Sequence, residues 1–169
     1  MTRYVALLRA VNVGGLKLPM TELKAMCEHA GFEAARTYIA SGNAIFRSAL
    51  GEAQVRAELE RRLEAFAGKP IAVMVRTPEE LHGVIAANPF PDAQPNRLLI
   101  LFLESAPPKD ALDRVRHQTV ERLALGKREI YIDYADGIGT SKLAIPAMKT
   151  GTARNLNTAR KLAELARAL

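Results

Sequence analysis

The chain has 169 residues, of which 49% are hydrophobic and 25% charged, a balance typical of a globular protein with one domain or two small fused subdomains. A single cysteine, Cys27, excludes an internal disulfide framework and a cysteine-rich metal site, and no apolar run approaches the roughly 18 residues that span a bilayer. The first residues are strand-like rather than a signal segment, so we expect a cytoplasmic protein without a membrane partner.

The net charge of +6 is unevenly distributed along the chain. Residues 1–50 carry a net +3, residues 51–137 a net −2 and residues 138–169 a net +5. Two basic ends around a slightly acidic middle indicate an anionic partner, either a nucleic acid or a phosphorylated ligand. The alternative is that arginine, with 16 residues against 8 lysines, is abundant throughout and serves solubility.

The first half of the chain predicts the element order β-α-β-β-α-β. The expected elements are a strand at 3–8, a helix at 19–30, strands at 37–40 and 44–46, a helix at 52–67 and a strand at 70–75. Leu23, Met26 and Cys27 recur on one face of the first helix, so we expect Cys27 to be buried and unreactive. This order is that of the ferredoxin-like fold.

The second half repeats the β-α-β-β order without a recognisable repeat of residues. The expected elements are a helix at 78–87, a proline-rich connection at 88–96, a strand at 98–103, a helix at 108–117, strands at 122–125 and 129–134, and helical segments at 141–149 and 153–168. Thr77 and Glu80 form a capping-box pattern at the first of these helices. We therefore expect an α+β protein of two ferredoxin-like (alpha-beta plait) subdomains with antiparallel sheets, at 1–76 and 77–169, the second ending in helices.

Short motifs that would carry catalysis or metal binding are weak. Gly126-Lys127 lacks the Ser or Thr of a phosphate-binding P-loop and is better interpreted as a hairpin turn. The three histidines lack a partner at i+4 for a helical metal site, and no Ser-His-Asp set can be assembled. The sequence therefore predicts no metal and no cofactor.

Two segments combine cations, amides and glycines in the manner of an anion site. The segments are residues 9–17 and 149–158, and with Lys142 outside them the candidate anion-binding residues are Arg9, Asn12, Gly14, Gly15, Lys17, Lys142, Arg154, Asn155 and Asn157. The first segment connects a strand to a helix, and backbone N–H groups in such a glycine loop can converge on an anion. The second segment predicts a helix capped by Thr152, whose N-terminus favours negative charge. The alternatives are a plain connecting loop and an ordinary amphipathic docking helix.

These segments also carry a family resemblance. The matching runs include Leu-Arg-Ala-Val-Asn-Val-Gly-Gly at 8–15, Thr-Tyr-Ile-Ala-Ser-Gly-Asn at 37–43, Asn-Pro-Phe-Pro at 88–91, Gly-Thr-Ser-Lys-Leu at 139–143 and Thr-Ala-Arg-Asn-Leu-Asn-Thr at 152–158. With them the chain resembles, over essentially its whole length, the bacterial domain-of-unknown-function family DUF1697. The resemblance implies two ferredoxin-like subdomains and no established activity, substrate or cofactor. The chain departs from the expected pattern at Ala40, where Gln is usual, and at Leu156, where Trp is usual.

Three functions remain open at this stage. The first is a module that binds a phosphorylated small molecule or a nucleic acid, and for it we expect residues 9–17 and 152–158 to form one shared anion-binding surface. The second is an enzyme on a phosphorylated substrate, in which the same cations stabilise developing charge and Tyr38 or Ser41, with Asn43 nearby, supplies the reactive group. The third is a homodimeric scaffold that pairs through strand edges.

Overall fold

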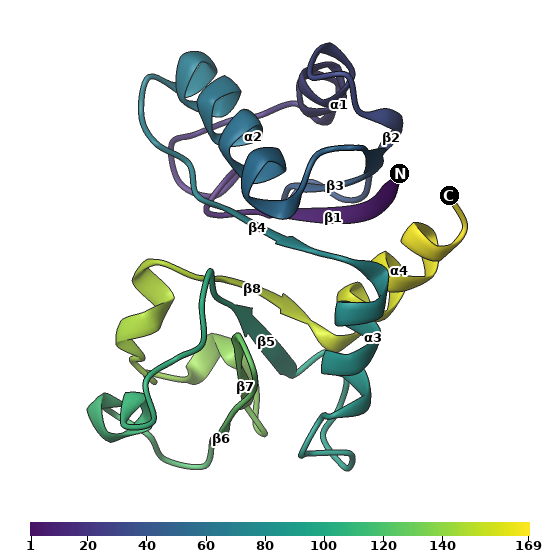
Figure 1. Ribbon diagram of the computed structural model, residues 1–169. Coiled ribbons are helices and arrows are strands. Elements are labelled where there is room, and N and C mark those ends of the chain that lie inside the picture. The colour runs from purple at the N-terminus through teal and green to yellow at the C-terminus, as the bar shows by residue number, and fades with distance from the viewer. The chain divides into compact units, whose positions relative to one another are not determined.

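The structure is a computed structural model that describes residues 1–169. The chain divides into two compact units, residues 1–80 with 162–169, and residues 81–161. Each unit contains a four-stranded antiparallel sheet, as Figure 1 shows. The α+β class and the duplicated ferredoxin-like arrangement expected from the sequence are confirmed. None of the helices is both long and apolar enough to cross a membrane.

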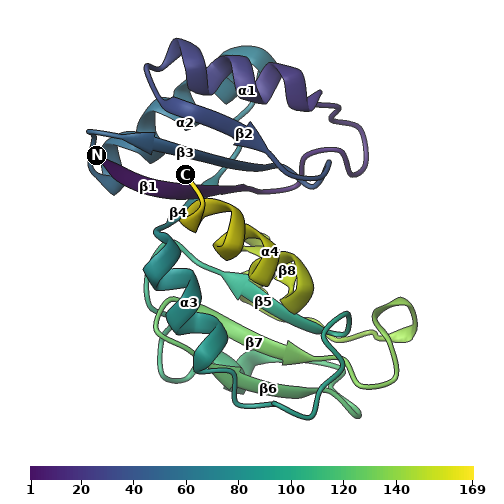
Figure 2. The same ribbon diagram turned by 90° about the vertical axis from the view of Figure 1, so that its right-hand side faces the viewer.

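The first unit follows the predicted element order. Its elements are β1 (Thr2–Leu8), α1 (Met20–His29), β2 (Glu33–Thr37), β3 (Asn43–Ser48), α2 (Glu52–Ala67) and β4 (Val73–Arg76). The strands are arranged in the order β2-β3-β1-β4, so β1 is an inner strand that pairs with β3 on one edge and β4 on the other. Both helices lie on one face of this sheet (Figure 2).

The core of the first unit forms because strand and helix periodicities present their apolar residues to the same space. Tyr4, Ala6 and Leu8 alternate along β1 and are buried with the apolar stripes of α1 and α2. Phe32 stacks on Phe46 with ring centroids 4.4 Å apart. On α2 the buried stripe consists of Val55, Leu59 and Leu63, whereas Phe66, in the last turn, is 43% exposed.

The sheet of the second unit has the same strand order as the first, but different segments pack on it. Its strands are β5 (Leu98–Phe102), β6 (Arg122–Leu125), β7 (Glu129–Asp133) and β8 (Thr152–Asn155), and the helices α3 (Pro78–Ala86) and α4 (Leu156–Arg167) each cross the boundary between the two units. The sheet order β6-β7-β5-β8 places β5 where β1 lies in the first sheet. α3, which straddles the unit boundary, begins with the predicted capping box, in which Glu80 N–H donates to Thr77 Oγ1 at 3.1 Å and Thr77 N–H to Glu80 Oε1 at 2.9 Å.

The expectation that helix replaces the last strand of the second half is wrong. Residues 152–155 form β8, which pairs with β5 from Leu99↔Asn155 to Phe102↔Thr152, and α4 begins only at Leu156. The amphipathic spacing of 153–168 is real over α4, but the pairing with an inner strand overrides helix propensity in the first residues.

The helices expected at 108–117 and 141–149 are also wrong. The structure has short 3₁₀ turns there, η1 (Ala111–Arg114), η2 (Ile138–Thr140) and η3 (Pro146–Lys149). Arg116 and Ala144 instead exchange two backbone hydrogen bonds, which draws these segments together across one face of the sheet. They cover the cluster formed by Leu101, Ile130 and Ile132 with irregular chain in place of helices.

The strand expected at 37–40 lies earlier in the chain. β2 ends at Thr37, and residues 38–42 form a loop closed by the hydrogen bond from Tyr38 N–H to the Asn43 carbonyl, 3.0 Å. Ile39 has a positive φ of 53°, a backbone conformation that a β-branched residue rarely adopts and that no strand contains.

Cys27 is buried in the first core, as its position on the apolar stripe predicts. Burial raises the pKa of the Cys27 thiol to about 12, because the thiolate is poorly solvated there. We therefore expect a thiol reagent at pH 8 to label the native chain far more slowly than the chain in concentrated urea. Native labelling at a rate close to that of the unfolded chain would contradict this burial.

Candidate functional site

Two loops of the first unit, residues 9–19 and 38–42, meet at one end of its sheet. Leu8 N–H donates to the Gly42 carbonyl at 2.9 Å, and the Asn12 amide nitrogen donates to the Ala40 carbonyl at 2.7 Å. Gly42 has a φ of 91°, and a Cβ there would lie 2.5 Å from Val11 Cγ2. Only glycine permits this approach of the two loops without displacement.

Asn12 fixes the shape of the first loop. Its Oδ1 accepts a hydrogen bond from Leu18 N–H at 2.8 Å, while its Nδ2 donates to the Leu18 carbonyl at 2.9 Å as well as to Ala40. Its own N–H donates to the Leu16 carbonyl. The Asn12 amide group is thus used by the protein itself, so this candidate shapes the loop that carries the others.

The loop backbone alternates between left-handed and ordinary conformations. Asn12 has a φ of 57° and Gly14 a φ of 69°, with Val13 between them on the negative side. Gly14 and Gly15 are exposed, and their N–H groups donate no backbone hydrogen bond. The loop borders an open pocket of about 450 Å³, lined by Asn12, Gly14, Leu16, Lys17, Leu18, Pro19, Met20 and Ala40.

The residues considered for catalysis in the second loop are engaged with one another. Asn43 is buried, and its Nδ2 donates to the Tyr38 carbonyl at 2.8 Å and to Ser41 Oγ at 3.1 Å. These contacts close the loop on itself, which is a structural role.

The second candidate segment lies in a strand and a helix start. Asn155, not Thr152, precedes α4, and its Oδ1 accepts a hydrogen bond from Thr158 N–H at 2.9 Å in the manner of a helix N-cap. Lys142 and Asn157 are exposed. The expected cap at Thr152 is therefore wrong by three residues, because β8 occupies the intervening positions.

Arg154 lies on β8 and is 6% exposed. Its Nη1 donates to Thr152 Oγ1 at 2.7 Å and to the Ala153 carbonyl at 2.9 Å, and burial lowers the pKa of the guanidinium to about 10. Arg76 at the end of β4 is likewise buried and donates to the carbonyl of the preceding residue. The equivalent outer strands of the two sheets thus each carry one buried arginine, a parallel that the sequence analysis missed.

The shared anion-binding surface expected from the sequence stays a prediction. Residues 9–17 fall in the first unit and residues 152–158 in the second.

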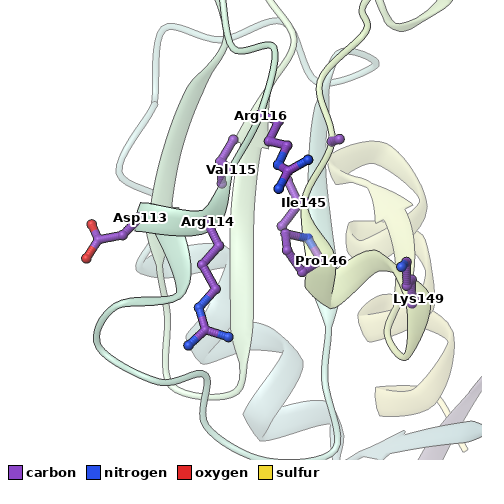
Figure 3. A pocket seen from close by; sticks show the side chains of 8 residues that line it. Asp113, Arg114, Val115, Arg116, Ile145, Pro146 and Lys149 are labelled. Carbon is purple, nitrogen blue, oxygen red and sulfur yellow. The ribbon is translucent and has the colours of Figure 1, made fainter.

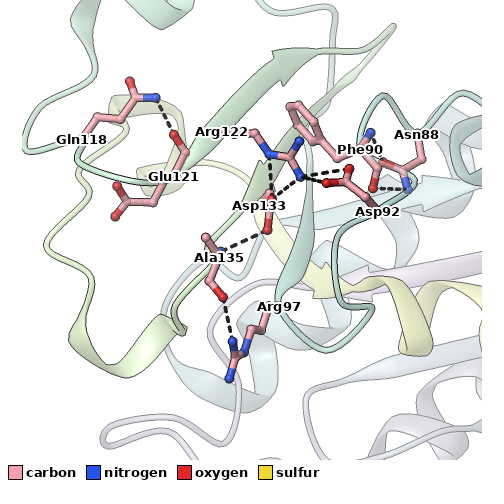
Figure 4. A network of polar contacts seen from close by, with 9 residues as sticks. All are labelled: Asn88, Phe90, Asp92, Arg97, Gln118, Glu121, Arg122, Asp133 and Ala135. Atoms are coloured by element: carbon pink, nitrogen blue, oxygen red, sulfur yellow. Dashed lines mark hydrogen bonds and ion pairs between the residues drawn. The ribbon is translucent and has the colours of Figure 1, made fainter.

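A polar network in the second unit holds the Asn-Pro-Phe-Pro run at 88–91 in place (Figure 4). Arg122 donates to Asp133 Oδ2 from Nη2 at 2.6 Å and from Nε at 2.9 Å, and it also reaches Asp92. The guanidinium of Arg122 lies 4.7 Å from the centroid of the Phe90 ring. Within the run, Asn88 Oδ1 accepts a hydrogen bond from Phe90 N–H at 2.9 Å. The run folds the connection to β5 against this arginine, so its role is structural.

Glu121 joins the residues before β6 to the Gly-Thr-Ser-Lys-Leu run. Its carboxylate accepts hydrogen bonds from the Ser141 hydroxyl and from Thr119 N–H, and these bonds lower the pKa of Glu121 to about 2. Ser141 Oγ in turn accepts a hydrogen bond from Leu143 N–H at 3.2 Å. This carboxylate therefore holds the run at 139–143 in place.

A second pocket lies between residues 113–116 and 144–149, and the sequence analysis did not anticipate it. It has a volume of about 650 Å³ and is lined by Asp113, Arg114, Val115, Arg116, Ala144, Ile145, Pro146 and Lys149 (Figure 3). Arg114 and Arg116 lie on one wall and Lys149 on the other. No group of three or more His, Cys, Asp or Glu residues is placed to hold a metal ion.

The two sheets of identical strand order define an α+β protein with a duplicated ferredoxin-like arrangement. The family model described as "Protein of unknown function (DUF1697)" matches residues 1–131, and the chain belongs to this family. Among solved structures it is similar to the conserved bacterial protein SP0830 from Streptococcus pneumoniae, with a TM-score of 0.80, 24% identity and 98% of each chain covered, a likeness of fold alone. A search of curated proteins finds no match.

Replacing Glu121 by Gln tests the carboxylate contacts. The folded-state pKa of Glu121 lies below its usual value of 4.5, so its ionised form stabilises the fold above that pH and the contribution is lost as the pH falls towards 2. Urea unfolding should show Glu121→Gln less stable than the wild type at pH 7, with the difference narrowing from pH 5 to pH 2.5. The exposed Asp136→Asn should show no such narrowing, and a difference independent of pH would refute the assignment.

Replacing Arg154 by Ala tests its structural role. Because its aliphatic stem and guanidinium are buried, we expect the free energy of unfolding to fall by about 1–3 kcal/mol, the usual cost of losing such contacts. Arg154→Met should recover part of the loss through its stem, and the exposed Arg160→Ala should be nearly neutral. Urea denaturation measures all three variants, and a neutral Arg154→Ala would show that the burial contributes little.

Proposed function

We propose that the protein binds a small anionic ligand at the loop surface formed by residues 12–20 and 38–42 of its first unit. The observation that carries this proposal is the alternating backbone of Asn12, Val13 and Gly14 beside the exposed cation Lys17. Where left-handed residues alternate with residues of negative φ, neighbouring N–H groups can turn towards one side of the chain and form a concave site of partial positive charge.

Electrostatics supports an anion at this place. Lys17 is the charged side chain that lines the pocket, and none of the eight lining residues is a carboxylate. Gly14 and Gly15 add N–H groups without backbone acceptors. A phosphate or carboxylate group would therefore accept main-chain hydrogen bonds and pair with one ammonium group.

The loops also expose apolar surface. Val13 is 63% exposed and Ile39 47% exposed, and Ile39 holds a left-handed backbone that is costly for a branched side chain. Met20, Leu16 and Pro19 line the same pocket as Lys17. An organic anion with a small apolar part would use both kinds of surface, which favours a phosphorylated or carboxylated metabolite-sized ligand over a bare ion.

Replacing Lys17 by Ala tests the proposal. With ¹⁵N-labelled protein titrated with phenyl phosphate, the amide signals of Val13, Gly14 and Gly15 should shift, and the variant should bind at least fivefold more weakly because it loses a charge-assisted hydrogen bond. Lys24→Ala removes an exposed lysine from α1 with the same change of net charge and should bind as the wild type does. Unmoved loop signals, or equal losses in the two variants, would refute the site.

A further inference from the structure

Backbone pairing joins the two segments that line the pocket of the second unit shown in Figure 3. Arg116 N–H donates to the Ala144 carbonyl and Ala144 N–H donates to the Arg116 carbonyl, each at 2.9 Å. These two bonds fix the distance between segments that lie almost thirty residues apart in the sequence. The walls therefore do not depend on contacts between the charged side chains that project from them.

The base of this pocket is apolar and anchored in the core. Ile145 is 4% exposed and belongs to the cluster that includes Leu101 and Ile130, and Val115 packs against that cluster. Pro146 lines the pocket beside Ile145 and begins η3. A ligand seated here would meet a hydrocarbon surface packed on the core, below its charged groups.

The cations around the pocket are little neutralised by the protein. Arg114 approaches Asp110 only at 3.9 Å, with both side chains well exposed, and such surface pairs contribute little. Neither Arg116 nor Lys149 forms a side-chain hydrogen bond or ion pair. The Asp113 side chain, although its residue lines the pocket, points away from it in Figure 3. Three positive side chains thus face a shared space without a carboxylate between them.

We infer that this pocket is a second binding site, for a phosphorylated small molecule that carries an apolar group and at least two negative charges. Two guanidinium groups match phosphate oxygens in a bidentate manner, and an ammonium group on the opposite wall suits a further charge. An anion between like charges also relieves their mutual repulsion. The site is separate from the loop surface of the first unit and does not depend on it.

A small molecule fits the pocket better than a nucleic acid strand. The volume of about 650 Å³ lies within the range of small-molecule sites. None of the eight lining residues is aromatic, whereas proteins that bind single strands stack the bases on aromatic rings. The apolar side chains at the base are aliphatic and suit the hydrocarbon part of a phosphate ester.

The test titrates the full-length ¹⁵N-labelled chain with 1-naphthyl phosphate, inorganic phosphate and a twelve-residue oligothymidylate, each followed by amide shifts. We expect the amides of 113–116 and 147–149 to shift with 1-naphthyl phosphate, which should bind several-fold more tightly than inorganic phosphate. Arg116→Ala should weaken that binding about tenfold or more, since a charge-assisted hydrogen bond is lost while the backbone pairing stays. The affinity of Arg116→Lys for 1-naphthyl phosphate should lie between those of the wild type and Arg116→Ala.

The controls separate this site from general electrostatics and from the first unit. Arg160→Ala removes an exposed arginine from α4 and should change the affinity less than twofold, and Lys17→Ala should leave the shifts at 113–116 unchanged. Equal losses in Arg116→Ala and Arg160→Ala would overturn the inference. So would shifts confined to other segments, inorganic phosphate binding as tightly as the ester, or the oligonucleotide binding the pocket more tightly than the ester.

Discussion

Each sheet depends on an inner strand, β1 or β5, whose backbone pairs along both edges. β1 bonds to β3 and β4, and β5 bonds to β7 and β8, in the same relative order. Because the inner strand fixes where its neighbours end, it also fixes where the loops begin. The loop with Asn12 follows the end of β1, and the register of β8 against β5 sets both the burial of Arg154 and the first residue of α4.

Sequence periodicity predicted the elements that are determined locally. The helix at 52–67 coincides with α2, the capping box of Thr77 and Glu80 forms, and Cys27 is buried on the predicted stripe. Prediction from periodicity failed where backbone hydrogen bonds between distant segments determine the structure. Residues 152–155 continue an amphipathic pattern but pair with β5, and residues 108–117 satisfy a helical pattern but pair at Arg116 with Ala144.

The candidate sites were predictable to different extents. The loop with Gly14 and Lys17 was predicted because glycines, an amide and cations are adjacent in the sequence, although the use of the Asn12 amide within the loop was not. The basic pocket of the second unit was not predicted, since Arg116 and Lys149 are brought together only by backbone pairing between distant segments. Arginine is a residue type that commonly binds anions, so Arg154 was a reasonable candidate. Its side chain is buried because β8 pairs in the sheet, and the sequence did not predict that pairing.

The network around Arg122 bears on how the protein behaves at high concentration. β6 is an outer strand with one unpaired edge, and such edges recruit further strands and lead to aggregation. Asp133 and Asp92 hold the guanidinium of Arg122, the first residue of this strand, in one place over Phe90. Because Asp133 lies on the paired strand β7, these bonds tie the first residue of the outer strand to its neighbour, so the same contacts that fold the proline-rich connection also oppose fraying of β6, which would expose further backbone to another chain.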